Sequence, residues 1–527
     1  MKRFLALFLT IIMLLAMFAS CIKTPDAQQT TPESTTPGET TPTQTTPVET
    51  TPAETTTPPE TTTEGGDDPV IPPTQTSAEE IVTALNPAQL FDSSLDSKEA
   101  ILENVASFDA VLNAFATEGY TKLDVDMVDG AKFETVLLTN GNELVTLYWQ
   151  ADKKEMRIVW EAYNADAVSV LQKNPTTGGG TLTMVQIGVE RVSETDNPNI
   201  GLCYIFKLSN GKAIIIDGGF NNELCAANVY AALAKLDIAK DENGKYQVEA
   251  WIFTHGHGDH NGVIYAFGAY ADEVDVAYFM YQFPSSEELS VEAGIVSVAG
   301  EADVHATVAA TFPNATYINP HVGLNYYFGN ATISMLYTPD VLWTPASQLD
   351  YYNNTSMIFK VAGGNTGFLC MGDAGEIAAE KSWSLFDAHA YQSGILQITH
   401  HGMSTGANGS HAWDNIKNIY EATGATTVVL PLGTRTEDPT NMKSNNGRWT
   451  ILFDYPYNKN SQMNFVVRRG DAPTSNGYFN RELLNRLVAT AETGHNYLAE
   501  MSAAYKNVKS LHGYNGINMI EDRKSVV

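Results

Sequence analysis

Four potential metal ligands lie within six consecutive positions of the chain. The stretch WIFTHGHGDHNG, residues 251–262, places His255, His257, Asp259 and His260 directly after a run of apolar residues. Imidazole and carboxylate groups bind Zn²⁺ and related cations, and residues two apart in an extended loop point the same way. His255 and His257 can therefore share one cation, while Asp259 and His260 turn toward a second. Because the chain has only 11 histidines in 527 residues, this density favours a metal site.

Three further apolar strands end in residues of the same types. The strand in AIIIDGG ends in Asp217, and the strand in TGFLCMGD ends in Gly-Asp, with Asp373 as its carboxylate. The strand in ILQITHHG leads directly into the pair His400 and His401. A lone aspartate or histidine pair is more often a surface or core feature. Their order along the chain favours a shared site.

This order of motifs resembles the signature of the metallo-β-lactamase superfamily. The resemblance rests on His-x-His-x-Asp-His after a strand, on the earlier aspartate, on Gly-Asp and on the final histidine motif, and it covers residues 181–470. It implies an α/β fold, the αββα sandwich, in which two mixed sheets pack face to face with helices outside. The metals would lie at one sheet edge.

The resemblance also implies a division of roles. Two divalent cations are expected, with Zn²⁺ as the first choice and Mn²⁺ as the alternative. Their expected ligand sets are His255, His257 and Asp373 for one metal, and Asp259, His260, Asp373 and His401 for the other. Asp217 would brace the histidine loop by hydrogen bonds rather than bind metal.

Catalytic roles follow from the same resemblance. Asp259 and Asp373 would help to hold two metals about 3.5–4 Å apart, with a hydroxide nucleophile between them. His400 would face the substrate and contact a phosphate oxygen or protonate the leaving group; a buried packing role is the competing interpretation. Asp340 and Asn354 are expected to orient ligands without binding metal.

One motif of the hydrolases in this superfamily is missing. Glyoxalase II and the lactonases carry a third histidine in a TPGH-like turn, and the turn YTPDVLW has Asp340 in its place. The other histidines in the interval, His305 and His321, sit in no such turn and are interpreted as ordinary. In lacking this histidine, and in the stretches NNTSMIFKV, HHG and LTMVQIGV, the chain resembles one branch of the superfamily. That branch comprises ComEC-type extracytoplasmic domains and teichoic acid phosphorylcholine esterases.

The leading functional hypothesis is a dinuclear-metal hydrolase that acts on a phosphoester, most specifically a phosphodiester, outside the cytoplasm. The alternatives are hydrolysis of another ester, a lactone or an amide, a ComEC-like nuclease, and a non-catalytic surface binding protein. The formal charge is −30 and no basic run occurs, so nucleic acid is not the expected substrate. No protein partner is predicted. Aromatic runs at 278–283 and 325–328 could cage a choline-like cation, although core strands are the more common explanation.

The N-terminal residues predict a targeting signal followed by a spacer. Residues 1–20 have a basic start and an apolar run that is short for a membrane span, as in a lipoprotein signal peptide. Cys21 in FASC would then be lipidated and would anchor the protein to the outer face of a bacterial membrane; an ordinary cleaved signal is the alternative. Residues 21–76 are rich in Thr and Pro, which predicts a disordered stalk. Since residues 1–76 hold 3 of the 31 basic and 9 of the 61 acidic residues, the remainder still carries −24.

Three segments should follow the stalk. Residues 77–173 are predicted to be a small α+β accessory domain, with helices at 78–91 and 97–120, the latter capped by Ser97, and then three strands. Residues 181–470 are the predicted catalytic domain, and residues 471–527 a helical extension, with its helix at 480–508. A disulfide between Cys203 and Cys225 is not expected, and Cys370 is predicted to be a buried thiol.

Overall fold

The computed structural model of the chain describes ten segments. They are residues 76–92, 97–187, 201–284, 301–344, 352–364, 366–402, 414–425, 427–431, 464–467 and 517–521. All of them belong to one structural unit, Pro73–Val527. The predictions for Cys21, the signal peptide, the stalk and the helix at 480–508 lie outside the described residues.

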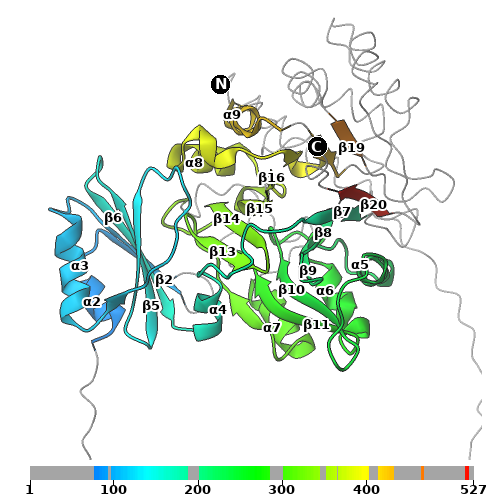
Figure 1. Cartoon of the computed structure of the whole chain (residues 1–527). Helices are drawn as coiled ribbons and strands as arrows, with labels where there is room; N and C mark the ends of the chain where they lie inside the picture. Colours follow the sequence, from blue (N-terminus) through cyan, green and yellow to red (C-terminus); the bar gives the residue numbers. More distant parts are fainter. Residues whose placement is uncertain are drawn as a thin grey trace, which may run out of the picture. The chain divides into compact units, whose positions relative to one another are not determined.

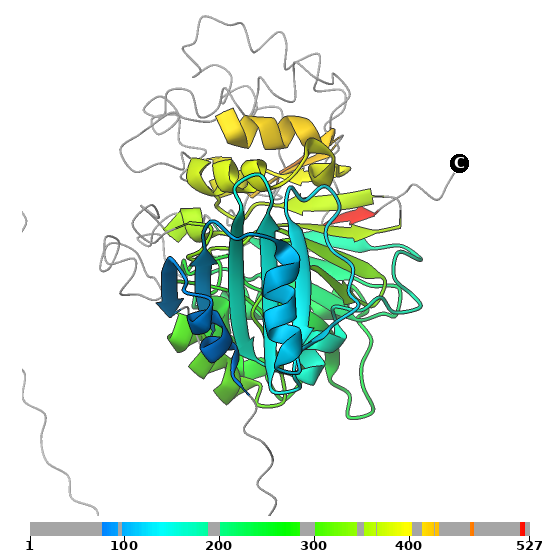
Figure 2. The same cartoon turned by 90° about the vertical axis from the view of Figure 1, so that its left-hand side faces the viewer.

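The accessory domain is an antiparallel sheet with helices on one face (Figures 1 and 2). The sheet order is β1-β2-β6-β5-β4-β3, with β1 (Gln89–Asp92), β2 (Lys98–Leu102), β3 (Thr121–Lys122), β4 (Glu134–Thr139), β5 (Glu143–Gln150) and β6 (Glu155–Ala162). Helices α2 (Ala78–Ala84) and α3 (Phe108–Thr117) cover the sheet, and α4 (Ala165–Ser169) follows β6. The three strands expected after the helices are β4, β5 and β6.

The helices predicted at 78–91 and 97–120 form only in part. The first ends at Ala84, and residues 98–102 of the second are strand β2, paired with β6. In β2, Ala100 faces one hydrophobic cluster and Ile101 faces another, which is the two-residue period of a strand. Distant partners on both faces thus outweigh the local helical pattern. The helix begins at Phe108, where the Ser107 hydroxyl, rather than Ser97, accepts the Ala110 N–H at 3.2 Å.

Among the described residues, two seven-stranded sheets form the catalytic domain, and the first includes a strand at 517–521, within the segment 471–527 that was expected to be a helical extension. The first has the order β12-β11-β10-β9-β8-β7-β20, with β7 (Thr183–Ile187), β8 (Cys203–Lys207), β9 (Ala213–Asp217), β10 (Tyr246–Ile252), β11 (Val274–Met280), β12 (Thr316–Ile318) and β20 (Ile517–Glu521). The second has the order β13-β14-β15-β16-β17-β18-β19, with β13 (Asn325–Phe328), β14 (Ala331–Tyr337), β15 (Ile358–Gly363), β16 (Thr366–Cys370), β17 (Ile395–Gln397), β18 (Thr427–Leu430) and β19 (Asn464–Val467). Both sheets are mixed. Strands β9 to β12 and β16 to β19 run parallel, whereas the remaining neighbours pair antiparallel.

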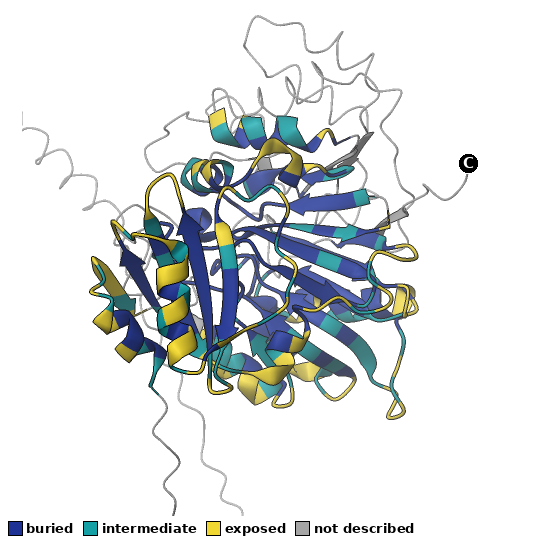
Figure 3. Ribbon diagram, turned by 60° about the vertical axis from the view of Figure 1, so that its left-hand side comes forward, coloured by how far each residue is buried: buried dark blue, intermediate teal, exposed yellow. Residues whose placement is uncertain are grey.

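Hydrophobic clusters place these sheets in layers. Tyr204 and Ile252 of the first sheet share one buried cluster with Phe359 and Phe368 of the second. The outer face of the first sheet packs against α5 (Glu223–Lys235), α6 (Val263–Ala266), η1 (Phe267–Tyr270) and α7 (Glu301–Thr311). The outer face of the second packs against α8 (Glu376–Leu385), η4 (Ala388–Tyr391) and α9 (Asp414–Thr423). The fold is therefore the expected αββα sandwich, and its strands are largely buried (Figure 3).

The accessory domain shares a hydrophobic cluster with the catalytic domain. Phe133 lies between the domains, with its ring centroid 5.5 Å from that of Trp343 and 5.6 Å from that of Phe386. Short β-bridges also pair Met127 with Leu324 and Ala131 with Phe386. The two domains predicted from the sequence therefore pack against each other through a common core.

Other sequence expectations concern thiols and membrane spans. Cys203, Cys225 and Cys370 are buried thiols. Within the described segments, no helix has the length and apolar character needed to cross a bilayer.

Candidate metal centre

Asp217 ends strand β9 and holds the loop that follows β10. Its Oδ1 accepts the Thr254 N–H at 2.7 Å, and its Oδ2 accepts the Thr254 hydroxyl at 2.8 Å. The same Oδ2 lies 2.7 Å from Nδ1 of His260. Since a carboxylate only accepts, His260 carries its proton on Nδ1 and presents Nε2 to the rest of the site. Asp217 thus makes the bracing contacts that the resemblance implies.

The conformation at Asp217 is itself held in place. Its φ of 53° lies in the left-handed region that few residues other than glycine adopt. The Trp251 indole N–H donates to the Asp217 carbonyl at 3.0 Å, which secures the turn. Burial raises the pKa of Asp217, while the charge of His260 and the hydrogen bonds of Thr254 act in the opposite direction.

The histidine loop is tightly packed. Its end is fixed by Gly262, where a Cβ would lie 2.2 Å from the Gly258 carbonyl oxygen, so that only glycine fits. The Asn261 side chain donates to the His255 carbonyl at 3.2 Å. His255 and His260 are fully buried, whereas His257 is slightly exposed. The loop therefore presents its imidazoles from a rigid backbone.

The histidine pair follows β17 in the short helix η5 (Thr399–Gly402). His400 has φ 48° and His401 has φ 51°, so two adjacent non-glycine residues are left-handed. Each such residue costs about 1–3 kcal/mol, and such strain clusters at functional sites. The Thr399 hydroxyl donates to the Ala374 carbonyl at 2.7 Å, and Nδ1 of His401 lies 2.9 Å from the Pro431 carbonyl oxygen. This second contact leaves Nε2 of His401 to face the site.

The turn that carries Asp373 is held by a glutamine. The Gln397 side-chain oxygen accepts the Met371 N–H at 2.7 Å, and its NH₂ group donates to the Gly372 carbonyl at 2.7 Å. Gly372 has φ 50°, and a Cβ there would lie 2.9 Å from Cβ of Thr254. The Asp373 N–H donates to the Ser356 hydroxyl at 3.1 Å. Gln397 was not predicted to contribute, although an amide inside an apolar strand was a signal for it.

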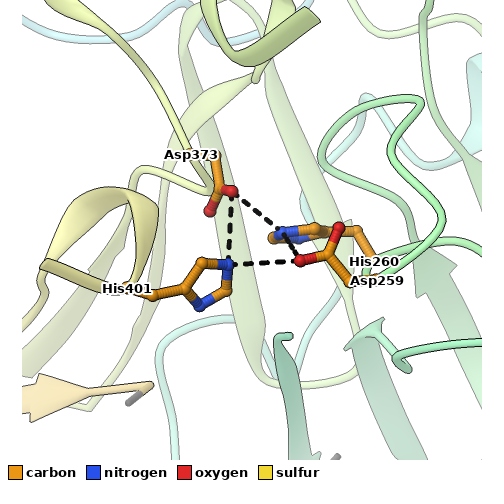
Figure 4. A group of neighbouring side chains, drawn as sticks. All are labelled: Asp259, His260, Asp373 and His401. Atoms are coloured by element: carbon orange, nitrogen blue, oxygen red, sulfur yellow. Dashed lines mark ion pairs between the residues drawn. The ribbon is translucent and has the colours of Figure 1, made fainter. Parts of the chain in front are cut away.

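Asp259, His260, Asp373 and His401 form the first of two ligand groups (Figure 4). Oδ2 of Asp373 lies 3.2 Å from Nε2 of both His260 and His401. Oδ2 of Asp259 lies 3.8 Å from Nε2 of His260 and 3.5 Å from Nε2 of His401. Tetrahedral Zn²⁺ with bonds of about 2.0–2.2 Å separates its ligand atoms by about 3.3–3.6 Å. These four separations are therefore close to the spacing that this coordination requires.

His255, His257 and Asp373 form the second group. Nε2 of His255 lies 3.1 Å from Nδ1 of His257 and 4.0 Å from Oδ2 of Asp373. Asp373 therefore belongs to both groups, and Oδ2 is its atom nearest to each. The two groups have the same members as the two ligand sets expected from the sequence.

Orphaned atoms test whether a cation fits this arrangement. Nε2 of His260, Nε2 of His401 and Oδ1 of Asp373 are buried and have no hydrogen-bond partner among the described residues. Buried polar atoms of this kind are costly unless something satisfies them. A divalent cation beside Oδ2 of Asp373 would satisfy the two imidazole nitrogens, and neutral imidazoles and carboxylates are suitable donors. The residues therefore fit a pair of divalent cations.

Charge is unevenly distributed over the two groups. Burial disfavours a charged His401, but the carboxylates of Asp373 and Asp259 outweigh it and raise its pKa to about 9. They raise the pKa of His260 as well. Burial opposes ionisation of Asp373, yet His260 and His401 hold its pKa well below the usual range. Burial, with the charge of His260, lowers the pKa of His255 well below its usual value.

His400 lies at the border of the site. Its Nε2 is 4.0 Å from Oδ2 of Asp373, and 15% of its side chain is exposed, against 0% for His401. The side-chain nitrogen of Asn353 lies 3.3 Å from the same Nε2. Asn354, the neighbour expected to orient ligands, uses its carbonyl to accept the Tyr337 hydroxyl at 3.0 Å. The asparagine that contacts a site histidine is therefore Asn353, in the one-turn helix η3 (Tyr352–Thr355).

Asp340 belongs to a different cluster. Gln282 donates to its Oδ1 at 2.6 Å, and Nδ1 of His321 lies 3.1 Å from the same atom. Among the described residues, no hydrogen bond or ion pair joins Asp340 to a ligand candidate, so the expected ligand-orienting contact is not formed. His321 is not the ordinary histidine expected, since it is buried and paired with Asp340. His305 contacts the Tyr281 hydroxyl at 3.2 Å, a packing role.

The aromatic runs considered for a choline cage are core strands and their continuations. Tyr281 and Phe283, after β11, are fully buried. Tyr326 and Phe328, in β13, are almost as inaccessible. These four side chains pack in the hydrophobic clusters of the sandwich, so they are not available to enclose a cation.

Comparisons with known proteins find similarity in solved structures alone. No protein-family model matches the chain, and no curated protein sequence does. One similar structure is the metallo-β-lactamase fold protein YhfI from Bacillus subtilis, with 13% identity, a TM-score of 0.29, and coverage of 50% of this chain and 93% of that one. A possible metal-dependent hydrolase from Veillonella parvula has 10% identity, a TM-score of 0.28, and coverage of 51% and 94%. CmlA, a diiron β-hydroxylase from Streptomyces venezuelae, has 11% identity, a TM-score of 0.28, and coverage of 50% and 47%.

Proposed function

We propose that this chain is a dinuclear-metal hydrolase of the metallo-β-lactamase superfamily, and that it cleaves phosphoesters, in particular phosphodiesters. The observation that carries the proposal is the position of Asp373, which is shared by both ligand groups. A carboxylate common to two buried groups can hold two cations at a short, fixed separation. The order of the motifs along the chain and the αββα sandwich support the same assignment.

The residues around Asp373 have separate tasks in this proposal. Two divalent cations would supply Lewis-acid activation of water and neutralise charge on the reacting phosphate. Asp217 and Thr254 fix the histidine loop, and Gln397 fixes the Asp373 turn, so the ligands stand ready without rearrangement. His400, partly exposed beside Asp373, is placed to contact a substrate phosphate oxygen. Asn353, 3.3 Å from Nε2 of His400, orients its ring.

Several features favour a phosphodiester over other substrates. Class B β-lactamases lack a bridging carboxylate, whereas Asp373, which belongs to both ligand groups, would supply one here. Residues 77–527 carry a formal charge of −24, which disfavours a polyanion such as DNA. We propose an extracytoplasmic substrate because the N-terminal residues resemble a lipoprotein signal that ends at Cys21.

A substrate panel tests the proposal. The purified chain is assayed on bis-p-nitrophenyl phosphate, p-nitrophenyl phosphorylcholine, nitrocefin, a lactone and single-stranded DNA, with Asp373→Ala as the matched control. The expected result is hydrolysis of a phosphoester, faster than that of nitrocefin, which Asp373→Ala loses. Faster cleavage of the lactone or nitrocefin would contradict the substrate class. Binding of less than about half an equivalent of metal per chain, where a dinuclear site needs two, would favour a non-catalytic binding protein.

A further inference from the structure

The accessory domain holds a loop of the catalytic domain by its backbone. This loop, residues 338–344, follows strand β14 and is here named the clamp loop. Oε2 of Glu99, in strand β2 of the accessory domain, accepts the Leu342 N–H at 2.7 Å. Both residues are almost fully buried. A hydrogen bond from a backbone N–H to a buried carboxylate is among the stronger kinds.

A tryptophan of the clamp loop is enclosed by the same domain. The Arg157 guanidinium lies 4.7 Å from the centre of the Trp343 ring, a cation–π contact. The Tyr148 ring meets Trp343 edge-on at 5.2 Å between centroids, and Phe133 lies 5.5 Å away. All three partners come from the accessory domain, so Trp343 cannot move without breaking this packing.

A third contact fixes the start of the clamp loop. Oε1 of Glu161, in β6, lies 3.7 Å from Nε2 of His321. Nδ1 of His321 in turn lies 3.1 Å from Oδ1 of Asp340, within the loop. Asn319 donates to the other oxygen of Glu161 at 3.2 Å, which fixes that carboxylate. The His321 imidazole therefore links the Glu161 carboxylate of the accessory domain to Asp340 of the clamp loop.

The other end of the clamp loop is tied to the metal centre. The Tyr337 hydroxyl lies 3.1 Å from the Thr344 hydroxyl and donates to the Asn354 carbonyl at 3.0 Å. The preceding residue, Asn353, contacts Nε2 of His400 at 3.3 Å. The Tyr352 ring lies 5.8 Å from the His257 ring, measured between centroids. Displacement of the clamp loop would therefore shift two side chains that contact site histidines.

We propose that the accessory domain is a positioning element of the hydrolytic site, and that Glu99 and Glu161 act through the clamp loop on Tyr352 and Asn353. The effect on catalysis that this proposal predicts rests on the proposed phosphoesterase function, whereas the predicted effect on amide exchange does not. If the accessory domain merely stabilised the fold, loss of one of its contacts would accelerate amide exchange alike in all segments of the catalytic domain. If it positions the site, exchange accelerates in residues 338–344 and 352–355 before the other segments.

The experiment compares three variants of the full chain. Glu99→Met removes the acceptor of the Leu342 N–H, and Glu99→Gln retains one, so the second should rescue the first. Glu143→Met is the matched control, because Oε2 of Glu143 accepts the Ala78 N–H at 2.9 Å inside the accessory domain and does not touch the clamp loop. Amide hydrogen exchange of residues 338–344 and 352–355, metal content, and kcat and KM on bis-p-nitrophenyl phosphate are measured for each.

Glu99→Met should keep its metal while exchange in both segments accelerates by about tenfold or more, as expected when a buried N–H loses its acceptor. Its kcat should fall more than its KM rises, and Glu143→Met should change neither segment. Wild-type exchange at 352–355 in Glu99→Met would overturn the proposal, whether or not the enzyme cleaves phosphodiesters. If Glu99→Met does not fold, Glu161→Gln, at a side chain with 21% exposure, provides the same comparison. Failure of the wild type on every phosphoester, with accelerated exchange in the variant, would contradict only the proposed function.

Discussion

Replacement of Asp217 by asparagine should weaken one metal group and spare the other. The asparagine oxygen can still accept the Thr254 N–H, which places its NH₂ group at the present position of Oδ2, 2.7 Å from Nδ1 of His260 and 2.8 Å from the Thr254 hydroxyl oxygen, which must now accept instead of donate. Nδ1 must then accept a hydrogen bond, so the imidazole proton moves to Nε2. That nitrogen is the one that lies 3.2 Å from Oδ2 of Asp373. A protonated Nε2 cannot bind a cation.

The magnitude follows from the loss of a partner that orients a ligating histidine. Such changes lower metal affinity about 10–100-fold, which equals about 1.4–2.7 kcal/mol. Titration of the metal-free chain with Zn²⁺ against a chelator should show this loss at the group containing His260. Among the described residues, the Asp217 side chain hydrogen-bonds to Thr254 and His260, so the group containing His255 and His257 should keep its affinity.

Asp340→Asn is the matched control for Asp217→Asn. Asp340 is equally buried and also pairs with a histidine, His321, but it contacts no ligand candidate among the described residues. The Asp340→Asn substitution should leave the metal affinities of both groups unchanged. Two results would refute the reasoning from the His260 tautomer. One is an equal loss of metal affinity at both groups in Asp217→Asn, and the other is the same loss at the His260 group in Asp340→Asn.

Three further predictions concern other parts of the chain. His401→Ala should lower the metal content, whereas His400→Ala should keep both metals and lose turnover by about 10²–10⁴; the reverse result would exchange their roles. Cys21→Ser should release the protein from the membrane into the medium, and unchanged fractionation would exclude the lipid anchor. Burial opposes a charged His321, but Asp340 raises its pKa from 6.5 to about 10. Its contribution to stability should therefore be complete below pH 6.5 and lost as the pH rises through about 10, so the melting-temperature advantage of wild type over His321→Gln should shrink over that range; a constant difference would contradict the pairing.

The sequence predicts the metal groups well because their signal is local. His255, His257, Asp259 and His260 lie in one loop, and the residues that complete the groups follow strand ends. The αββα sandwich was expected from the same motifs. Which asparagine contacts His400 is not predictable from the sequence, because Asn353 and Asn354 are adjacent residues of the same type and both are buried in η3.

Contacts between distant segments carried no sequence signal. Glu161, His321 and Asp340 come from β6, from the loop before β13 and from the clamp loop, and no spacing rule relates them. The same limit explains β2, where Ala100 and Ile101 find partners on opposite faces that a helical pattern does not reveal. Long-range pairing decided the structure in both cases.

Metal analysis of the wild-type chain and of Asp373→Ala tests the central claim most directly. Because Asp373 is the one residue common to both ligand groups, its loss should release both metals together. The account predicts about two equivalents of divalent metal per chain in the wild type, as a two-metal site requires, and loss of both in Asp373→Ala. An Asp373→Ala chain that keeps two metals would contradict the dinuclear site.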